Sequence, residues 1–410
     1  MESSKIKELA QDQQDYVVAM RREFHRSPEL SGKEFHTRER LIEEIEKMGV
    51  PYEKLPGTGL IAIIEGGKPG KNKILRADID ALPLQEETEN LKQPKVCVSE
   101  IPGRCHACGH DAHVTMLLGA AKLLSAHRDA FRGKIKFLFE PSEESIPASM
   151  KETVRAAGYD GEGGAGFMIQ QGVLEGVDMA LALHVQPVVP AGKIQIARHE
   201  ATASSDVYDI MLTGKGGPGA MPENAVDPVP AMAELITAIH MLPTREVSSM
   251  ENCVISIGQV ELPGSVWNVV PERAHIVGGF RTFNNDVRAL LRQRIPELAE
   301  GIAKANRCTA VCTQTLGYDA TINDEAMALE VSRTLENIVG EGNVILTNKP
   351  FMGSEDFGCF TQHVPGVLFW LGIGTGEDDK PLHNPYFKMD LNALPVGTAC
   401  HVQNALHFLK

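Results

Sequence analysis

The sequence predicts an α/β protein of two domains, in which a smaller domain is inserted into a larger one. The chain has 410 residues, which is more than one hydrophobic core usually holds. Short apolar runs alternate with segments of helical spacing towards both ends of the chain, which is typical of a mainly parallel sheet. Between these regions the order becomes strand, helix, two strands, helix and strand, as in a ferredoxin-like unit.

The first part of the larger domain follows a polar N-terminal segment with helical spacing. Four short apolar runs suit buried strands, and one segment has the spacing of a helix for which Asp111 is the expected N-cap. The expected strands are residues 58–66, 73–80, 134–140 and 179–185, and the expected helix is 111–127.

The inserted domain is expected over residues 191–318. Its predicted strands are 205–214, 252–262, 273–283 and 309–318, and its predicted helices are 227–242 and 285–306, the second with an expected kink at Pro296. The α/β pattern then resumes with a helix at 325–340, a strand at 364–374 and a helix at 396–409. The expected division is therefore a catalytic domain formed by 1–190 and 319–410 and a lid or dimerisation domain at 191–318.

Composition excludes several classes of partner. The net charge of −14 disfavours nucleic acids and anionic membranes. The longest apolar run, residues 364–374, is too short and too rich in glycine to span a membrane. The N-terminal segment has no apolar core of the kind that a signal peptide needs, and the eight cysteines are unevenly spaced. We therefore expect a cytoplasmic protein with reduced thiols.

Several groups that bind metals follow the predicted strands. In open α/β sheets the carboxyl ends of parallel strands meet at one edge, where functional groups gather. Here the strand ends, the start of the first long helix and one later loop all carry such groups: Asp78 and Asp80, the segment HACGHDAH at 106–113, Glu143 and Glu144, His184, and His383. This convergence predicts a site at that edge.

Each of these pieces also has a plain structural interpretation. A single histidine such as His184 is more often structural than a ligand, and two adjacent glutamates are usually a solvated edge. Cys105 and Cys108 form a CxxC pair, which is found in zinc ribbons and redox sites. The chain has no second CxxC pair, and a redox pair would not explain the carboxylates and histidines at the other strand ends.

The segment HACGHDAH favours a metal site more strongly. Cys108 and His110 are one residue apart, so both side chains can enter one cavity from a turn. A thiolate with an imidazole suits zinc, while manganese, cobalt and nickel stay open. Of the adjacent Glu143 and Glu144, one can bind a metal while the other moves protons, which is worth roughly 10²–10⁴ in rate.

Taken together, the motifs RADIDALP, HACGHDAH, PSEE, LHV, GSEDF and LHNP resemble the amidohydrolases of the aminoacylase and carboxypeptidase metallopeptidase superfamily. The branch they resemble most contains indole-3-acetyl-amino acid hydrolases and bacterial N-acyl-amino acid amidohydrolases. The resemblance runs from about residue 15 to the C-terminus. It implies a two-metal hydrolase that uses a metal-bound water to cleave the amide bond of N-acyl amino acids or related conjugates.

The resemblance also implies roles for individual residues. Cys108 would bridge two divalent metals, with His110 and His184 completing one site and Glu144 and His383 the other. Manganese or zinc is favoured, and cobalt or nickel is possible. Glu143 would be the general base, and Asp78 would orient a ligand. His113 is interpreted as structural.

In the inserted domain, Asn268 and Arg281 match positions with which the family holds the substrate and its carboxylate. A surface salt bridge is the plain alternative for Arg281. The edge strands expected in this domain, together with the resemblance, predict a homodimer.

The chain departs from the family pattern at two places. Pro218 in GGPGAMPE replaces a histidine that in the family stabilises the oxyanion in the partner's active site, and losing one such donor costs about 10²–10³ in rate. Residues 145–162 lengthen the usual link after the glutamates. We expect this insertion to include a short helix at 151–161 and to reshape the acyl pocket.

Three alternative functions stay open at this point. A dipeptidase or an aminobenzoyl-glutamate-type carboxypeptidase would use the same site with a different pocket. A metal-binding homologue with little hydrolytic activity is kept open by Pro218. A thiol redox protein using Cys105 and Cys108 is the least favoured, because it leaves most of the motifs unexplained.

Overall fold

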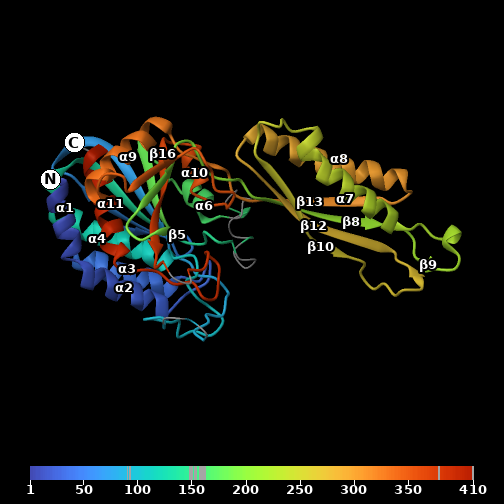
Figure 1. The fold of residues 1–410 in the computed structure, drawn as a ribbon, viewed down its shortest axis with the longest axis horizontal. Coiled ribbons are helices and arrows are strands. Elements are labelled where there is room, and N and C mark those ends of the chain that lie inside the picture. The colour runs from blue at the N-terminus through green and yellow to red at the C-terminus, as the bar shows by residue number, and fades with distance from the viewer. Residues whose placement is uncertain are drawn as a thin grey trace. The chain divides into compact units, whose positions relative to one another are not determined.

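The computed structural model describes residues 1–89, 91, 94–146, 151, 155–156, 163–376 and 379–408. The chain forms two compact units (Figure 1). The larger unit contains Met1–Ala201, Ile322–Pro350 and Cys359–Lys410, and the smaller unit contains Thr202–Thr321 and Phe351–Gly358. Residues 194–197 form a strand of the large sheet, so the segment 191–201 packs with the larger unit.

The larger unit is built on a mixed sheet of eight strands in the order β1-β2-β4-β3-β5-β16-β6-β15. Its centre is parallel, because β3 pairs in parallel with β4 and β5, and β5 with β16. Towards its edges the sheet is mixed, because β2 runs antiparallel to β1 and β4, and β6 runs antiparallel to β16. The strands are β1 (Tyr52–Lys54), β2 (Leu60–Glu65), β3 (Lys68–Asp78), β4 (Arg132–Glu140), β5 (Met179–Pro190), β6 (Ile194–Ala197), β15 (Val344–Thr347) and β16 (Gly366–Gly374).

Helices cover this sheet and share its hydrophobic core. Helix α11 packs against α1, α4 and α9, and α2 packs against α4 (Figure 1). The helices of the larger unit are α1 (Ser3–Gln11), α2 (Gln14–Arg26), α3 (Phe35–Lys47), α4 (His110–Ala126), α6 (Gly164–Gln170), α9 (Glu325–Val339) and α11 (Ala393–Phe408), with the short η1 (Arg128–Ala130) and α10 (Gly358–Thr361). None of the described helices is long and apolar enough to cross a membrane.

The strand register places the candidate groups at one edge. Asp78 at the end of β3 lies opposite Glu140 at the end of β4, three residues before Glu143. On the other side of β3, Arg76 lies opposite Ala182, which puts His184 level with the end of β3. The buried Arg76 ties these ends together through Asp78 (2.8 Å) and Glu140 (2.7 Å).

The start of α4 differs from the prediction. The expected N-cap, Asp111, is the second residue of the helix, which begins at His110 and is preceded by Gly109 as N-cap. Gly109 has a φ of 91°, and a Cβ atom there would lie 2.3 Å from Val185 Cγ2. Glycine is therefore required both for the left-handed conformation and for the close approach to β5. This turn delivers His110 at the first helical position.

The smaller unit has the predicted ferredoxin-like β-α-β-β-α-β order, with an antiparallel sheet in the order β10-β12-β8-β13. Helices α7 and α8 share a core with alternate residues of the strands, so they cover one face of the sheet. Helix α8 is continuous through Pro296. The elements are β8 (Asp206–Thr213), α7 (Pro228–Arg245), β10 (Cys253–Glu261), β12 (Arg273–Thr282), α8 (Asn285–Ala305) and β13 (Thr309–Leu316).

Three small elements complete this unit. Strands β9 (Gly217–Pro218) and β11 (Val269–Val270) form a pair beyond the first residue of β12, Arg273. The short η2 (Pro222–Asn224) follows β9. A second short pair joins β7 (Glu200–Thr202) and β14 (Thr321–Ile322). The α/β class with an inserted ferredoxin-like unit is therefore the architecture of this chain.

Candidate active site

Cys108 lies at the centre of a ring of possible metal ligands. Its Sγ atom is 3.3 Å from His383 Nε2 and 3.5 Å from His184 Nε2. His383 Nε2 is in turn 3.3 Å from Glu144 Oε1. The ligand atoms of Cys108, His110 and His184 lie within 4.8 Å of one another, as do those of Cys108, Glu144 and His383. Two overlapping groups of three thus share one cysteine.

Two of the histidines direct Nε2 into this ring. His184 Nδ1 donates to the Val185 carbonyl oxygen at 2.7 Å, which leaves Nε2 as the acceptor facing Cys108. Burial and the nearby His113 lower the pKa of His184 well below its usual value, so the imidazole is neutral. His110 Nδ1 lies 3.1 Å from Asp80 Oδ1, which likewise directs His110 Nε2 into the site.

The loop carrying the two glutamates is held by buried carboxylates. Glu34 Oε1 accepts from the Ser142 backbone N–H at 2.9 Å, and Asp80 Oδ2 accepts from the Glu144 backbone N–H at 3.0 Å. Ser142 has a φ of 61°, a conformation that is uncommon without glycine. The two carboxylates therefore fix the backbone on both sides of Glu143.

The donor set fits a divalent metal. Two ligands bound tetrahedrally at about 2.1 Å are separated by about 3.4 Å, close to the spacings between Cys108, His383 and His184. Among the described residues, His110 Nε2 and Glu144 Oε1 are buried without a hydrogen-bond partner. Divalent cations bound in the two groups of ligands would satisfy both atoms.

The electrostatics of the ring also favour the binding of a cation. Burial and the negative Glu144 raise the pKa of the Cys108 thiol well above its usual value. Burial opposes protonation of His110, yet the negative Asp78 and the thiolate form of Cys108 raise its pKa well above the usual value. Protons thus compensate the negative charge in the absence of metal, and a metal that binds here would displace them.

Asp78 and His113 form a separate pair beside the ring. His113 Nδ1 lies 2.6 Å from Asp78 Oδ1, and His113 Nε2 accepts from the Val185 backbone N–H at 2.9 Å. Both ring nitrogens of His113 are therefore engaged within the protein. Asp78 approaches His110 Nε2 only at 3.7 Å, whereas Asp80 hydrogen-bonds the other nitrogen of that ring. The sequence indicated Asp80 as one of the groups that follow the predicted strands, but it assigned this residue no role.

The loop that carries His383 is braced by a buried lysine. The Pro385 carbonyl accepts from Lys95 Nζ at 2.9 Å and from the Glu87 backbone N–H at 3.0 Å. The His383 backbone N–H donates to the Ala107 carbonyl at 2.9 Å, and His383 has a φ of 61°. These contacts hold a residue with 53% of its side chain exposed in a strained backbone conformation.

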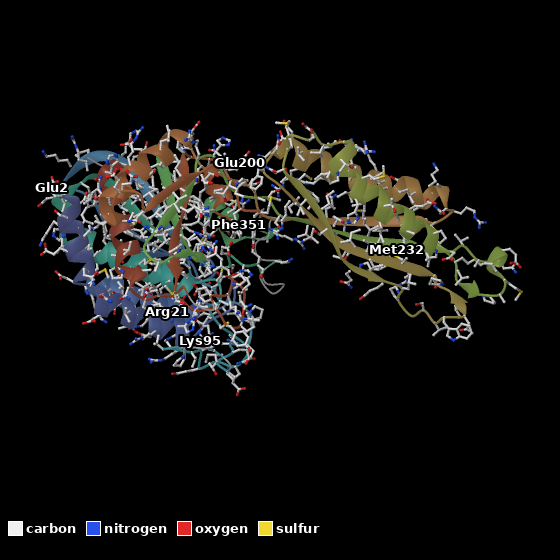
Figure 2. All side chains as sticks on the ribbon, viewed as in Figure 1. Glu2, Arg21, Lys95, Glu200, Met232 and Phe351 are labelled. Carbon is white, nitrogen blue, oxygen red and sulfur yellow. The ribbon has the colours of Figure 1, made fainter. Side chains whose placement is uncertain are left out.

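Lys95 belongs to a chain of buried charges. Its Nζ lies 2.7 Å from Glu86 Oε1, and His25 Nε2 lies 3.2 Å from the same oxygen. His25 Nδ1 lies 2.7 Å from Asp111 Oδ2, to which Arg21 Nε also pairs at 2.9 Å. The chain therefore leads from the residue after His110 to the loop of His383. Figure 2 labels Arg21 and Lys95 in the larger unit.

Within the smaller unit, the two expected substrate-binding residues do not lie together. Arg281 is near one end of β12, and its Nη1 donates to the Met352 carbonyl and to Ser354 Oγ. Asn268 lies beyond the other end, next to β11, whose Val269 pairs with Pro218. Arg273 begins β12 and lies eight residues from Arg281 along an extended strand, which is a distance of roughly 27 Å. Asn268 comes before Arg273, beyond that end of the strand.

The remaining expectations concern the cysteines and the insertion. All eight cysteines are free, and burial raises the pKa of Cys105 to about 12, which is unsuited to a reactive thiol. The helix expected at 151–161 falls mostly outside the described residues.

Comparison with known proteins identifies the family. Residues 74–407 match the profile of peptidase family M20/M25/M40. The chain is 32% identical over 411 residues to thermostable carboxypeptidase 1 of Saccharolobus solfataricus, covering 98% of both chains. It is 32% identical over 402 residues to IAA-amino acid hydrolase ILR1-like 2 of Arabidopsis thaliana (97% and 86% covered). It is 33% identical over 399 residues to N-acetylcysteine deacetylase of Bacillus subtilis (96% and 97% covered).

Solved structures agree with this result. A putative aminohydrolase from methicillin-resistant Staphylococcus aureus matches with a TM-score of 0.87 and 29% identity, covering 100% of both chains. The YXEP protein of Bacillus subtilis, described as a dinuclear metal-binding peptidase, matches with a TM-score of 0.78 and 29% identity, covering 97% of this chain and 99% of that one.

The chain belongs to peptidase family M20/M25/M40. It is a metal-dependent amidohydrolase, and the resemblance to the branch of the indole-3-acetyl-amino acid hydrolases is confirmed.

Proposed function

We propose that this amidohydrolase uses two divalent metals to cleave the amide bond of N-acyl amino acids or related amino-acid conjugates. The observation that carries the proposal is the ring around Cys108, in which two groups of three ligand atoms share one thiol beside a pair of adjacent glutamates. Three protein ligands per metal leave positions for water and substrate. The dinuclear peptidase among the similar structures supports the count of two.

We assign the ligands as the motifs suggest. Cys108 is shared, His110 and His184 complete one site, and Glu144 and His383 complete the other. Mixed thiolate, imidazole and carboxylate ligands suit manganese or zinc, and cobalt or nickel also fits this set. The spacings of 3.3–3.5 Å among Cys108, His184, His383 and Glu144 support the assignment.

Divalent ions in such a site supply Lewis acidity, which polarises the substrate carbonyl and lowers the pKa of water towards about 7. Glu143 takes the proton of the attacking water as general base. It then gives this proton to the amide nitrogen as the C–N bond breaks, so that the free amine leaves. Glu34 and Asp80 hold the backbone around Glu143, which keeps its carboxylate directed at the reacting atoms.

Arg281 is proposed to bind the carboxylate of the amino-acid half, because its guanidinium is held by neutral acceptors and has no carboxylate partner among the described residues of its unit. Asn268 lies beyond the far end of β12, too far from Arg281 to contact the same small substrate within one chain, so its proposed contact is with the substrate of the partner in the proposed homodimer. Asp78 is proposed to act through His113, with which it pairs at 2.6 Å.

Two alternatives rest on specific observations. The similarity to a carboxypeptidase favours peptide-like substrates as a second class for the same site. Pro218 is exposed in β9 and has no side-chain donor, so an oxyanion contact from this position is absent. This feature favours weak turnover of ordinary substrates, and at the extreme a metal-binding homologue.

The proposed assembly is a homodimer in the cytoplasm. Trp267 is 97% exposed beside Asn268, and Val266 and Met221 are also exposed apolar residues near this end of the smaller unit. Exposed apolar clusters of this kind mark protein interfaces. The eight free cysteines support a reducing compartment.

Amine release from a panel of N-acyl amino acids and dipeptides tests the proposal. We expect hydrolysis by protein loaded with manganese or zinc, loss of hydrolysis after chelation, and recovery when metal is restored. Protein that binds two metals yet releases no amine from any member of the panel contradicts the proposed hydrolase and favours the binding homologue.

A further inference from the structure

The open face of the sheet in the smaller unit contains a hollow centred on Gly279. Helices α7 and α8 cover the opposite face, so positions 277, 279 and 281 of β12 lie on the open one. Directly opposed residues share a face, and Gly279 lies opposite Val207 of β8 and Ser256 of β10. The missing side chain at Gly279 leaves a gap between these two residues.

The surrounding residues turn this gap into an apolar trough. Along β12 the trough extends to Val277 and Arg281. On the neighbouring β10, Gln259 lies opposite Val277 and Val254 lies opposite Arg281. A bulge between Ile257 and Gln259 widens the β10 side at Gly258. The hollow measures about 450 Å³, within the roughly 300–1,000 Å³ typical of small-molecule sites. The trough is lined by Val207, Val254, Ser256, Gln259, Val277 and Arg281.

One end of the trough is positively charged. Arg281 Nη1 is anchored by the Met352 carbonyl and Ser354 Oγ, both neutral acceptors of the same unit. Asp206, the acidic residue that lines the trough, pairs with Arg288 instead, at 2.6 Å. An anchored guanidinium without an acidic partner among the described residues of this unit suits bidentate binding of a carboxylate.

We propose that the trough binds the side chain of the amino-acid half of the substrate, and that this side chain is large and apolar, as in leucine or phenylalanine. The inference rests on the proposed function, and it deepens it by naming the substrate class. A carboxylate on Arg281 places the attached side chain next to Val254, which lies opposite Arg281, and next to the gap at Gly279. Val207, Val254 and Val277 make the trough beside Gly279 mainly apolar, so it favours an apolar side chain over a charged one.

Hydrolysis of N-acetyl amino acids that differ only in side chain tests the trough. We expect kcat/KM for N-acetyl-leucine and N-acetyl-phenylalanine to exceed that for N-acetylglycine by about 10- to 200-fold. A Cβ atom at Gly258 meets nothing within 4 Å, so Gly258→Leu fills the trough without a backbone clash. It should bring the leucine-to-glycine ratio down towards one. Gly301→Leu on exposed α8, where a Cβ also meets nothing, is the matched control and should keep the wild-type ratio.

If the wild type prefers N-acetylglycine or N-acetylaspartate, or if Gly258→Leu lowers kcat/KM equally for all substrates, the proposed role of the trough is wrong. The proposed hydrolase function would still stand. If no N-acetyl amino acid is hydrolysed, the proposed function fails, and binding still tests the trough. In protein with labelled valine methyl groups, N-acetyl-phenylalanine should shift the resonances of Val207, Val254 and Val277. N-acetyl-phenylalaninamide, which lacks the carboxylate, should shift them far less. Equal shifts with both compounds, or none with either, overturn the proposal.

Discussion

Asp80 contacts three groups of the candidate site through one carboxylate. Its Oδ1 faces His110 Nδ1 at 3.1 Å, and its Oδ2 accepts from Ser31 Oγ at 2.7 Å and from the Glu144 backbone N–H at 3.0 Å. A single buried residue thus orients one proposed ligand and the backbone of another. Because a carboxylate only accepts hydrogen bonds, it also fixes the His110 tautomer that leaves Nε2 for a metal.

Replacing Asp80 by asparagine should weaken metal binding by about 10- to 100-fold. The amide keeps one acceptor oxygen but turns an NH₂ group towards an N–H donor of His110 or Glu144. Competition with a chromogenic chelator measures the affinity. Asp129→Asn, in the exposed η1 segment, is the matched control. An affinity equal to wild type would show that Asp80 does not orient the ligands.

Sequence reasoning found the reactive residues better than the residues that hold them. Cys108, His110, Glu144, His184 and His383 were selected because their chemistry is unusual at strand ends, and the structure brings them together. Glu34 gave no such signal, because a glutamate in a polar segment looks solvated. Its burial and its bond to Ser142 depend on contacts between residues 108 positions apart.

At the scale of elements, the position of His383 depends on Glu86 and Lys95. The sequence around them has no periodic hydrophobic pattern, so nothing in it predicted that Lys95 would be buried. Its side chain is 4% exposed between Glu86 and the Pro385 carbonyl. Burial alone would raise the pKa of Glu86, but His25 and Lys95 lower it to about 2, so the carboxylate stays charged.

Lys95→Met should weaken one metal site and spare the other. Without the ammonium group the Pro385 carbonyl loses a donor, and the strained loop of His383 loosens. We expect a tenfold or larger loss of affinity for one of the two metals in a calorimetric titration. Lys54→Met, at an exposed pair with Glu39, should leave both affinities unchanged. Equal weakening of both metals in Lys95→Met would contradict a local role.

Long, strongly patterned elements were predicted closely, and short ones were not. The buried strands at the sheet centre and helices α4, α8, α9 and α11 follow apolar runs or clear helical spacing. The edge strands β1 and β15 and the neighbouring β6 have three or four residues and no such pattern, so the mixed direction of the sheet was not foreseen. The start of α4 was misplaced because Gly109 acts as N-cap through its backbone alone.

At the scale of the whole molecule, the proposed homodimer explains the exposed end of the smaller unit. Trp267 is the most exposed of the large apolar side chains described. Tryptophan buried at an interface commonly contributes much of the binding energy. Asn268 is the next residue after Trp267, and it lies beyond the end of β12 that is opposite to Arg281.

Sedimentation velocity should give a mass of about twice the 44.6 kDa of one chain. Trp267→Glu should shift the protein towards monomer at micromolar concentration, because the interface would bury an unpaired charge. Met250→Glu, at another exposed apolar residue of the same unit, should stay dimeric. A wild-type protein that sediments as a single chain would contradict the assembly.

The direct test of the central claim is the rate of amine release from an N-acetyl amino acid by metal-loaded wild type and Glu143→Gln, with bound metal measured in both. If Glu143 moves the proton while its neighbours hold the metals, the variant keeps the wild-type metal content and loses about 10²–10⁴ in kcat. A variant that binds the same metals and turns over at the wild-type rate would contradict the account of this site.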